Sequence, residues 1–451
     1  MKQKRPSRGV FVLSIETLLT CGTMVNMKKT LIWILILSPL IILLSDTGSV
    51  GSTIIEKVLL LRIVAFVGTG LLCLMAWSST FIKNDIVESS KRLVKNPMFI
   101  AATVNIGLLC LSTLFAFDRY IAFFGELTRG EGLLTILTCY VLFVYMLLVF
   151  HTTEWNKFFA TVSVTGIVLF VVELSQMHRI DRPYSLVGNT IFLAAVLLFV
   201  GFAGYYFIVQ QKKTGQSSAV FYGWIILLMS AIGIIFTKTR GTLVGIAVGT
   251  LVFSLVAVIY GRGKTFCGIN GRKLGLIIGG LIISFIVLFG ATYTASIWKK
   301  VPGLNRVATT DVGNTGARLT YLRISGKGFM ASTIKQKIFG WGWDNYAFFW
   351  NKNYDPTVYF YDVGNADPAH NKLADELIMG GLVGLISYIA LWFVFFAQTI
   401  RITKHNFSLG LGIAFLGVSY FVHNLFIFDS PETMFLFYSL LAFVGYTAYE
   451  K

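Results

Sequence analysis

One short segment of the chain collects several groups that could perform acid–base chemistry. In DPAHNKLADEL, residues 367–377, a histidine (His370) lies among three carboxylates, an asparagine and a lysine. Neutral imidazole is the usual general base near pH 7, whereas carboxylates in the first turn of a helix also stabilise its N-terminus. The segment therefore predicts either a base that activates a hydroxyl group or the polar start of a helix. Both interpretations stay open on these residues alone.

Arginine and lysine residues at the ends of other apolar segments could bind an anion. The planar guanidinium group donates parallel hydrogen bonds to phosphate oxygens and stays charged at every relevant pH. Two such groups at one site would neutralise a diphosphate and stabilise it as a leaving group. The alternative interpretation is an anchor at lipid headgroups, which we favour for Arg119 and Arg182. The candidates for anion binding are Arg129, Lys238, Arg240, Arg318 and Arg323.

Motifs for several other chemistries are missing from the sequence. No segment has the ligand spacing of a zinc site, the acidic pairs of a divalent-metal site, a nucleotide-binding loop or a serine-centred nucleophile elbow. We therefore expect no metal and no cofactor. The five cysteines form no CxxC pair, so we interpret them as core residues or lone thiols. The formal charge of +17 could suggest nucleic acid, but no nucleic-acid-binding module is present and we expect no such partner.

The elements that must position these residues are membrane helices. Of 451 residues, 55% are hydrophobic and 13% are charged, and the mean hydropathy is +0.73, which excludes an ordinary soluble protein. Apolar runs of about 20 residues, the length of a membrane crossing, recur along the chain. We predict an all-α membrane protein with about twelve transmembrane helices. The predicted spans are 30–45, 57–78, 98–117, 132–151, 156–174, 188–209, 219–236, 240–260, 274–298, 372–397, 407–427 and 432–448.

The distribution of Lys and Arg predicts the orientation of these spans. Short cytoplasmic connections are enriched in basic residues, and the segments richest in Lys and Arg fall on one side if both termini are cytoplasmic. The long connection after the ninth span then lies outside, and its aromatic and turn residues predict one or two interfacial helices. The predicted organisation is a basic N-terminal segment (1–29) with an interfacial helix at 9–27, spans one to nine (30–298), a partly helical extracytoplasmic loop (299–371) and spans ten to twelve (372–451). Translation could start at Met1, Met24 or Met27.

Together these residues resemble the O-antigen ligase/polymerase family of membrane glycosyltransferases. The segment DPAHNKLADELIMGGLVGLISY is similar to the family's pattern of His-Asn, Asp, Gly-Gly and Tyr, and its matching positions include His370, Asn371 and Asp375. The segments FGELTRGEGLL, RPYSLVGNTIFLA, TKTRG and ARLTYLR resemble further family elements in the same order. Met379 stands where many relatives carry a glutamate, so no carboxylate base is assigned there.

The resemblance implies transfer of a glycan from an undecaprenyl-diphosphate-linked donor to an acceptor hydroxyl, with inversion at the anomeric carbon. It also implies that Arg240 and Arg318 bind the diphosphate and that His370 activates the acceptor. The implied location is the cytoplasmic membrane of a bacterium, among membrane lipids, with the site facing outside. The further substrate-binding candidates are Arg129, Lys238, Arg323, Trp341, Trp343, Asp367, Asn371 and Asp375.

The sequence leaves several alternatives open. A repeat-unit polymerase or a protein O-glycosyltransferase of the same family would share these residues and differ in the acceptor. A lipid-linked glycan flippase or other transporter would also need an outward basic cavity, but not an activating histidine. A structural or signalling membrane protein would give the arginines no reason to converge, whereas the enzyme hypothesis predicts that Arg240, Arg318 and His370 lie in one cavity.

Overall fold

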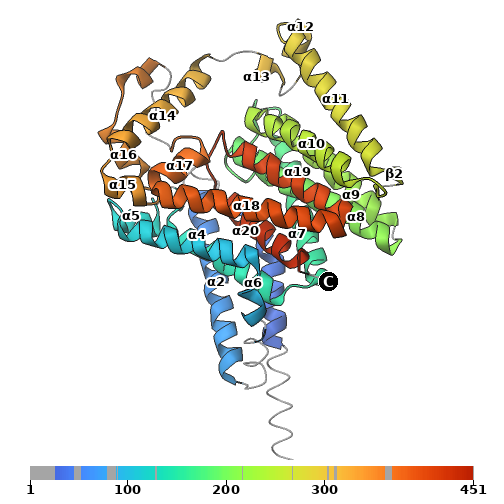
Figure 1. Ribbon diagram of the computed structural model, residues 1–451, viewed down its shortest axis with the longest axis horizontal. Helices are drawn as coiled ribbons and strands as arrows, with labels where there is room; N and C mark the ends of the chain where they lie inside the picture. The colour runs from blue at the N-terminus through green and yellow to red at the C-terminus, as the bar shows by residue number, and fades with distance from the viewer. Residues whose placement is uncertain are drawn as a thin grey trace, which may run out of the picture.

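In the part of the chain that it describes, the computed structural model consists of helices, the turns between them and one short strand pair (Figure 1). The structure describes residues 26–44, 52–78, 88, 90–126, 129–215, 217–266, 268–301, 304–308, 312–360 and 368–449. In these ranges, the strands are β1 (Thr265–Phe266) and β2 (Ile269–Asn270), paired antiparallel. The prediction of an all-α membrane protein is therefore confirmed. Residues 9–25 of the predicted interfacial helix and Asp367 lie outside the described residues.

Every predicted span overlaps an apolar helix. Within the described ranges, nine helices have the length and composition of a membrane crossing. These are Asn26–Leu43, which ends in the 3-10 helix η1 (Ser38–Leu43), α2 (Ser52–Ser78), α4 (Pro97–Leu114), α7 (Thr152–Gln176), α8 (Thr190–Thr214), α9 (Ser217–Phe236), α10 (Arg240–Tyr260), α11 (Gly271–Thr292) and α18 (Gly381–His405). Shorter helices cover the other predicted spans, and these are α6 (Leu133–Val149), α19 (Phe407–His423) and α20 (Pro431–Thr447). The total of about twelve crossings stays a prediction.

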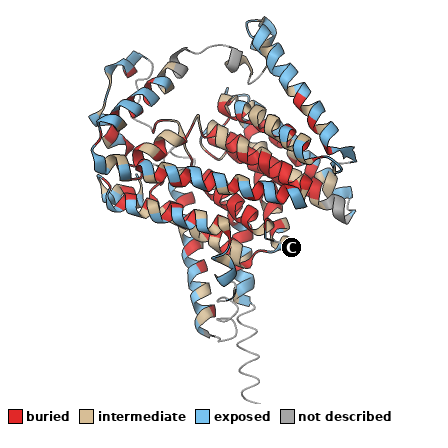
Figure 2. Cartoon of the chain, viewed as in Figure 1, coloured by how far each residue is buried: buried red, intermediate tan, exposed pale blue. Residues whose placement is uncertain are grey.

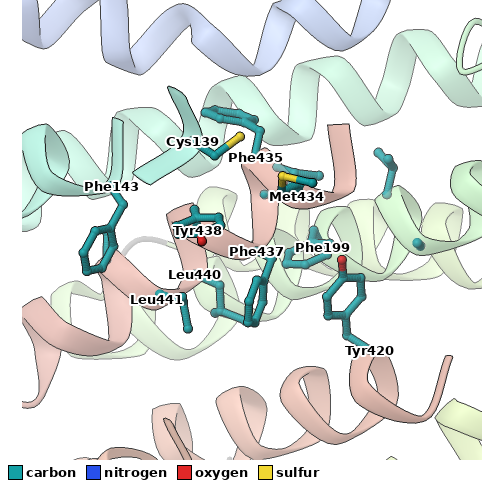
Figure 3. Close-up of a cluster of buried hydrophobic side chains, with 14 of the residues drawn as sticks. Cys139, Phe143, Phe199, Tyr420, Met434, Phe435, Phe437, Tyr438, Leu440 and Leu441 are labelled. Atoms are coloured by element: carbon teal, nitrogen blue, oxygen red, sulfur yellow. The ribbon is translucent and has the colours of Figure 1, made fainter. Parts of the chain in front are cut away.

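The centre of the helix bundle is α20. Its residues from Pro431 to Gly445 are all buried, and Figure 3 shows its side chains between those of α6, α8 and α19. Ser430 caps the helix by accepting a hydrogen bond from the backbone N–H of Thr433, as a serine at this position does. Glu432 in the first turn forms a buried ion pair with Lys57 of α2 at 2.7 Å. By contrast, α11 exposes most of its surface (Figure 2), as expected of a helix that faces lipid.

Close contact between α10 and α19 brings one end of each helix together below the long loop. Gly249 of α10 allows this approach, because a Cβ atom there would lie 2.1 Å from the Oγ atom of Ser419 in α19. Small residues let membrane helices pack backbone to backbone. The contact therefore fixes Arg240, the first residue of α10, relative to His423, the last residue of α19.

The predicted tenth span, 372–397, is not one continuous helix. It divides into α17 (Lys372–Met379) and α18 at Gly381, whose backbone has φ = +69°. A Cβ atom on Gly381 would lie 2.4 Å from the backbone nitrogen of Gly340, so both the conformation and the contact require glycine. The backbone N–H groups of Trp341 and Gly342 donate to the carbonyl oxygens of Ile378 and Met379 at 2.9 and 3.0 Å. The prediction was wrong because the long loop, rather than a further helical turn, satisfies these carbonyl groups.

The long loop is more helical than the one or two helices that the sequence predicts. Its three longest helices pack on α17, and one of these, α15, also packs on α18. Its first two helices, α12 and α13, pack on each other, and α13 also packs on α10. Figure 1 shows them along one edge of the bundle, where α13 lies between α12 and α14. The loop elements are α12 (Ser296–Lys300), α13 (Leu304–Ala308), α14 (Val312–Ala331), α15 (Ile334–Phe339), α16 (Tyr346–Lys352) and η2 (Pro356–Phe360). A further short helix, α5 (Arg119–Phe124), follows α4.

Candidate active site

A polar cavity of about 180 Å³ lies where α10, α13, α14 and α19 meet the segment before α17. It contains all three residues whose convergence the sequence predicts, Arg240, Arg318 and His370. The roles of these residues in catalysis stay a prediction, but their positions allow one ligand to contact all three. The lining residues are Arg182, Ile191, Thr239, Arg240, Gly241, Arg306, Arg318, Tyr321, His370, His423 and Phe426.

His370 is held at the cavity by its backbone and by contacts of its ring with two aromatic side chains. Its φ of +52° is uncommon for a residue with a side chain. Its ring lies 5.9 Å from that of Tyr321 and 5.6 Å from that of Phe428, measured between centroids. The Nδ1 atom is 2.9 Å from the carbonyl oxygen of Pro368. Because a carbonyl oxygen only accepts, Nδ1 donates, and in the neutral ring Nε2 keeps the lone pair that a base requires.

The polar residues after His370 hold its backbone in place. Asn371 caps α17 by accepting from the backbone N–H of Ala374 at 3.1 Å, and its amide donates to the carbonyl oxygen of Leu425 at 3.0 Å. Asp375 is fully buried and accepts from the backbone N–H of Ala369 at 2.8 Å. Neither side chain lines the cavity. These contacts brace the turn that contains His370, and the predicted contact of Asn371 and Asp375 with substrate stays a prediction.

A buried ionic cluster anchors this turn to the bundle. The Nζ atom of Lys372 lies 3.0 Å from Asp429 and 3.3 Å from Glu376, and its backbone N–H donates to the carbonyl oxygen of Asn424. Asp429 also accepts hydrogen bonds from Tyr420 and Asn424. A buried charge needs such partners to offset its desolvation. The crowding of ionisable groups around His370 therefore has a structural reason, in addition to any catalytic one.

Arg240 and Arg318 reach the cavity from two different helices. Arg240 begins α10, and Arg318 lies on α14. Burial lowers the pKa of Arg318, and the nearby positive charges of Arg240 and Arg306 lower it further. The lowered pKa means that the protein itself provides little compensation for this charge. An anionic ligand would supply that compensation.

Two further arginines line the same cavity, and the sequence did not predict this. Arg182, interpreted above as a lipid anchor, and Arg306, which was not a candidate, both contact the cavity. Burial and then the charge of Arg306 lower the pKa of Arg182 to about 10. Both residues lie on the predicted outer side, and Arg182 begins the segment RPYSLVGNTIFLA, which resembles a family element. That shared location was the available signal, but each position alone is also typical of a headgroup anchor.

Lys238 lies at the rim of the cavity rather than in its lining. Its Nζ atom forms an ion pair with Asp181, whose pKa this hydrogen bond lowers. The backbone of Lys238 has φ = +51°, so the chain turns sharply between α9 and α10. Its carbonyl oxygen accepts a hydrogen bond from Arg306 at 3.5 Å.

The other predicted binding residues that the structure describes lie outside the lining. Arg129 approaches Glu131 and Asp344 and stacks on the ring of Phe428. Arg323 pairs with Asp355 at 2.9 Å on an exposed face of α14. The indole rings of Trp341 and Trp343 are buried near Lys352 and Lys372, respectively. Their predicted contacts with sugar therefore have no support in this geometry. Across the described residues, no group of three or more His, Cys, Asp or Glu side chains could hold a metal ion.

Comparison with known proteins identifies one family. Residues 225–389 match the family model described as O-antigen ligase. The matched range includes Arg240, Arg306, Arg318 and His370, whereas Arg182 and His423 lie outside it. No curated protein matches the chain.

Proposed function

We propose that this chain, a member of the O-antigen ligase family of membrane glycosyltransferases, transfers a glycan from an undecaprenyl-diphosphate-linked donor to an acceptor hydroxyl. The observation that carries the proposal is the single cavity that collects His370 with arginines from α10 and α14. A base beside a cluster of guanidinium groups suits the attack of a hydroxyl on a carbon that bears a diphosphate leaving group.

His370 acts on the acceptor in this mechanism. Its Nε2 atom accepts the hydroxyl proton while the acceptor oxygen forms a bond to the anomeric carbon of the donor. The bond from that carbon to the diphosphate oxygen breaks on the opposite side, so the configuration inverts. The hydrogen bond from Nδ1 to the carbonyl oxygen of Pro368 fixes the tautomer and the ring orientation that this step requires.

Arg240 and Arg318 act on the leaving group. The diphosphate gains one negative charge when its bond to the sugar breaks, and two guanidinium groups stabilise that charge. Because both arginines are partly buried at the cavity, their interaction with the developing charge is less screened than in water. The step requires no nucleotide and no electron donor.

The location and the acceptor are parts of the same proposal. We place the chain in the cytoplasmic membrane of a bacterium, with both termini inside and the cavity at the outer face. The acceptor is a glycan, a lipid or a protein, so a repeat-unit polymerase and a protein O-glycosyltransferase are variants of this function. Labelling of a cysteine introduced in α15 by a membrane-impermeant reagent on intact cells would support the orientation, whereas protection in intact cells and labelling after lysis would reverse it.

The direct test is release of undecaprenyl diphosphate from a purified donor in the presence of candidate acceptor extracts. Wild type should release it, and His370→Ala and Arg318→Ala should lose the release. Lys327→Ala is the matched control, because Lys327 is an exposed basic residue on the same helix as Arg318. Donor that crosses the bilayer chemically unchanged, in wild type and in His370→Ala alike, would instead identify a transporter.

A further inference from the structure

The cavity holds more positive charge than a lipid-linked diphosphate can balance. Four arginines line it, and its lining contains no Asp or Glu among the described residues. A diphosphate that joins a sugar to a lipid carries one negative charge on each phosphate. Arg240 and Arg318 balance these two charges in the bound donor, so Arg182 and Arg306 have no counter-anion from the donor's diphosphate until it leaves with its third charge.

Arg182 and Arg306 form a separate pair, held by consecutive residues of one turn. The Nε atom of Arg182 donates to the carbonyl oxygen of Thr237 at 3.3 Å, and Arg306 donates to the carbonyl oxygen of Lys238 at 3.5 Å. The turn between α9 and α10 thus aligns two guanidinium groups that repel each other. Arg306 is the neighbouring charge that most affects Arg182, whereas Arg240 is the one that most affects Arg318.

Asp181 is the one carboxylate among the described residues whose charge offsets this second pair: it raises the pKa of Arg182, but burial and Arg306 still leave that pKa lowered. Neither Arg182 nor Arg306 has a carboxylate within salt-bridge distance among the residues the structure describes. Asp181, next to Arg182 in sequence, is paired with Lys238 at the rim. Holding two like charges close together in a partly buried site is costly unless a ligand supplies the opposite charge.

We propose that Arg182 and Arg306 form a second anion subsite, which binds a phosphate or carboxylate group on the transferred glycan or on the acceptor. This inference rests on the proposed function, since it takes Arg240 and Arg318 as the diphosphate subsite. The inference also specifies a property of the substrates that the family match leaves open, namely that the transferred glycan or the acceptor carries an acidic group. Each guanidinium group has donors beyond the one used on the turn, so the pair can grip an oxyanion from two sides.

A binding experiment separates the two subsites. The full-length protein in lipid nanodiscs is titrated with undecaprenyl diphosphate to saturation and then with inorganic phosphate, by calorimetry. Wild type should show a second saturable binding event. Arg182→Gln/Arg306→Gln should weaken that event roughly ten- to a hundredfold, as expected for lost charge-assisted hydrogen bonds, and change the first event less than about twofold. Arg318→Gln should show the reverse.

Arg179→Gln is the matched control for the second subsite, because Arg179 is an exposed arginine in the same connection between α7 and α8. It should leave both binding events unchanged. Absence of phosphate binding after saturation, or equal weakening in Arg179→Gln, would overturn the inference. So would weaker binding of undecaprenyl diphosphate in the double variant, since the pair would then belong to the diphosphate subsite.

A transfer experiment identifies which molecule carries the acidic group. One arm compares donors with a uronic acid against neutral donors, and the other compares phosphorylated against unphosphorylated acceptors. The double variant should raise the KM only in the arm whose substrate is acidic, and leave neutral substrates within about twofold. An equal loss with acidic and neutral substrates would refute the second subsite. If wild type binds no undecaprenyl diphosphate, the proposed function fails, while phosphate binding by the unliganded protein still tests the pair.

Discussion

The two walls of the cavity are built by opposite means. We define the histidine wall as residues 368–375 with Asn424 and Asp429, and the arginine wall as Arg182, Arg306 and Arg318. The histidine wall is a buried network in which side chains bind backbone groups and the Lys372 ammonium group contacts two carboxylates. The arginine wall consists of half-buried cations on the α7–α8 connection, on α13 and on α14, and the positive charges of these cations repel one another.

This difference indicates what each wall contributes. A base must keep its reacting atom in a fixed position, and the histidine wall fixes it before any substrate arrives. An anion site needs charge that is not already neutralised, and the arginine wall keeps that charge available. The negative charge that neutralises the arginine wall then comes from the ligand rather than from the protein. Two results would contradict this comparison: substitutions in the histidine wall that change only ligand binding, or substitutions in the arginine wall that lower the stability of the protein.

His370→Ala should have the largest effect on catalysis. Loss of a general base reduces turnover by about 10²–10⁴-fold, while binding of undecaprenyl diphosphate should persist because Arg240 and Arg318 are unchanged. Transfer rate and ligand affinity are measured on the same preparation. His405→Ala, at the exposed end of α18, is the control. A loss of affinity that matches the loss of rate would show that His370 binds the donor instead of activating the acceptor.

Lys372→Met should have the largest effect on stability. Removal of one partner from a buried ion cluster costs about 3–5 kcal/mol, because it leaves Asp429 and Glu376 as uncompensated charges. We expect a lower midpoint of thermal unfolding in detergent and less folded protein in the membrane. Lys335→Met, a change of the same kind on the exposed face of α15, should leave the midpoint unchanged. Full stability in Lys372→Met would show that the cluster does not support the histidine wall.

Arg318→Lys should show an intermediate effect confined to the ligand. Lysine keeps the positive charge but loses the bidentate geometry, so affinity for undecaprenyl diphosphate should fall by about tenfold, near 1.4 kcal/mol. The midpoint of unfolding should stay the same, because the charge is kept and no ion pair of Arg318 is lost among the described residues. A clear loss of stability would mean that Arg318 is a structural residue, like those of the opposite wall.

Arg323→Gln should have the smallest effect. Its ion pair with Asp355 is exposed, and such pairs contribute about 0–1 kcal/mol. Thermal unfolding and transfer are both measured, because Arg323 was a predicted substrate-binding residue. Reduced transfer at unchanged stability would support that prediction and extend the arginine wall along α14.

The helices and the central convergence could be predicted from the sequence. Long apolar runs specify membrane helices because backbone groups in lipid must be satisfied within each segment. Arg240, Arg318 and His370 were expected together because each lies at the same predicted side of the membrane, and they line one cavity. Hydrophobicity and the order of segments predict the helices, whereas the choice of these three residues among the outer basic residues came from the family resemblance.

The sequence could not predict the features that depend on long-range backbone contacts. The break at Gly381 results from hydrogen bonds with residues of the turn at Gly340. The local sequence around Gly381 does not indicate that this turn is its partner. Arg182 and Arg306 meet at one turn although they are distant in sequence. Trp341 is of a residue type that often binds sugars, but its ring is buried. The residue type could not distinguish these roles, because aromatic side chains serve core packing and ligand stacking equally well.

The burial of α20 also constrains the order of assembly. Among the described helices, α20 leaves the ribosome last, yet its side chains fill the centre of the bundle (Figure 3). Membrane helices can insert before they pack on one another, and chains begin to fold during synthesis. The earlier helices are therefore inserted in the membrane before the helix that packs between them has been made. Until then, the Lys57 side chain of α2 lacks its ion-pair partner Glu432. Final packing of the bundle is timed by the arrival of α20, so the protein becomes competent only after nearly all of the described chain has been made.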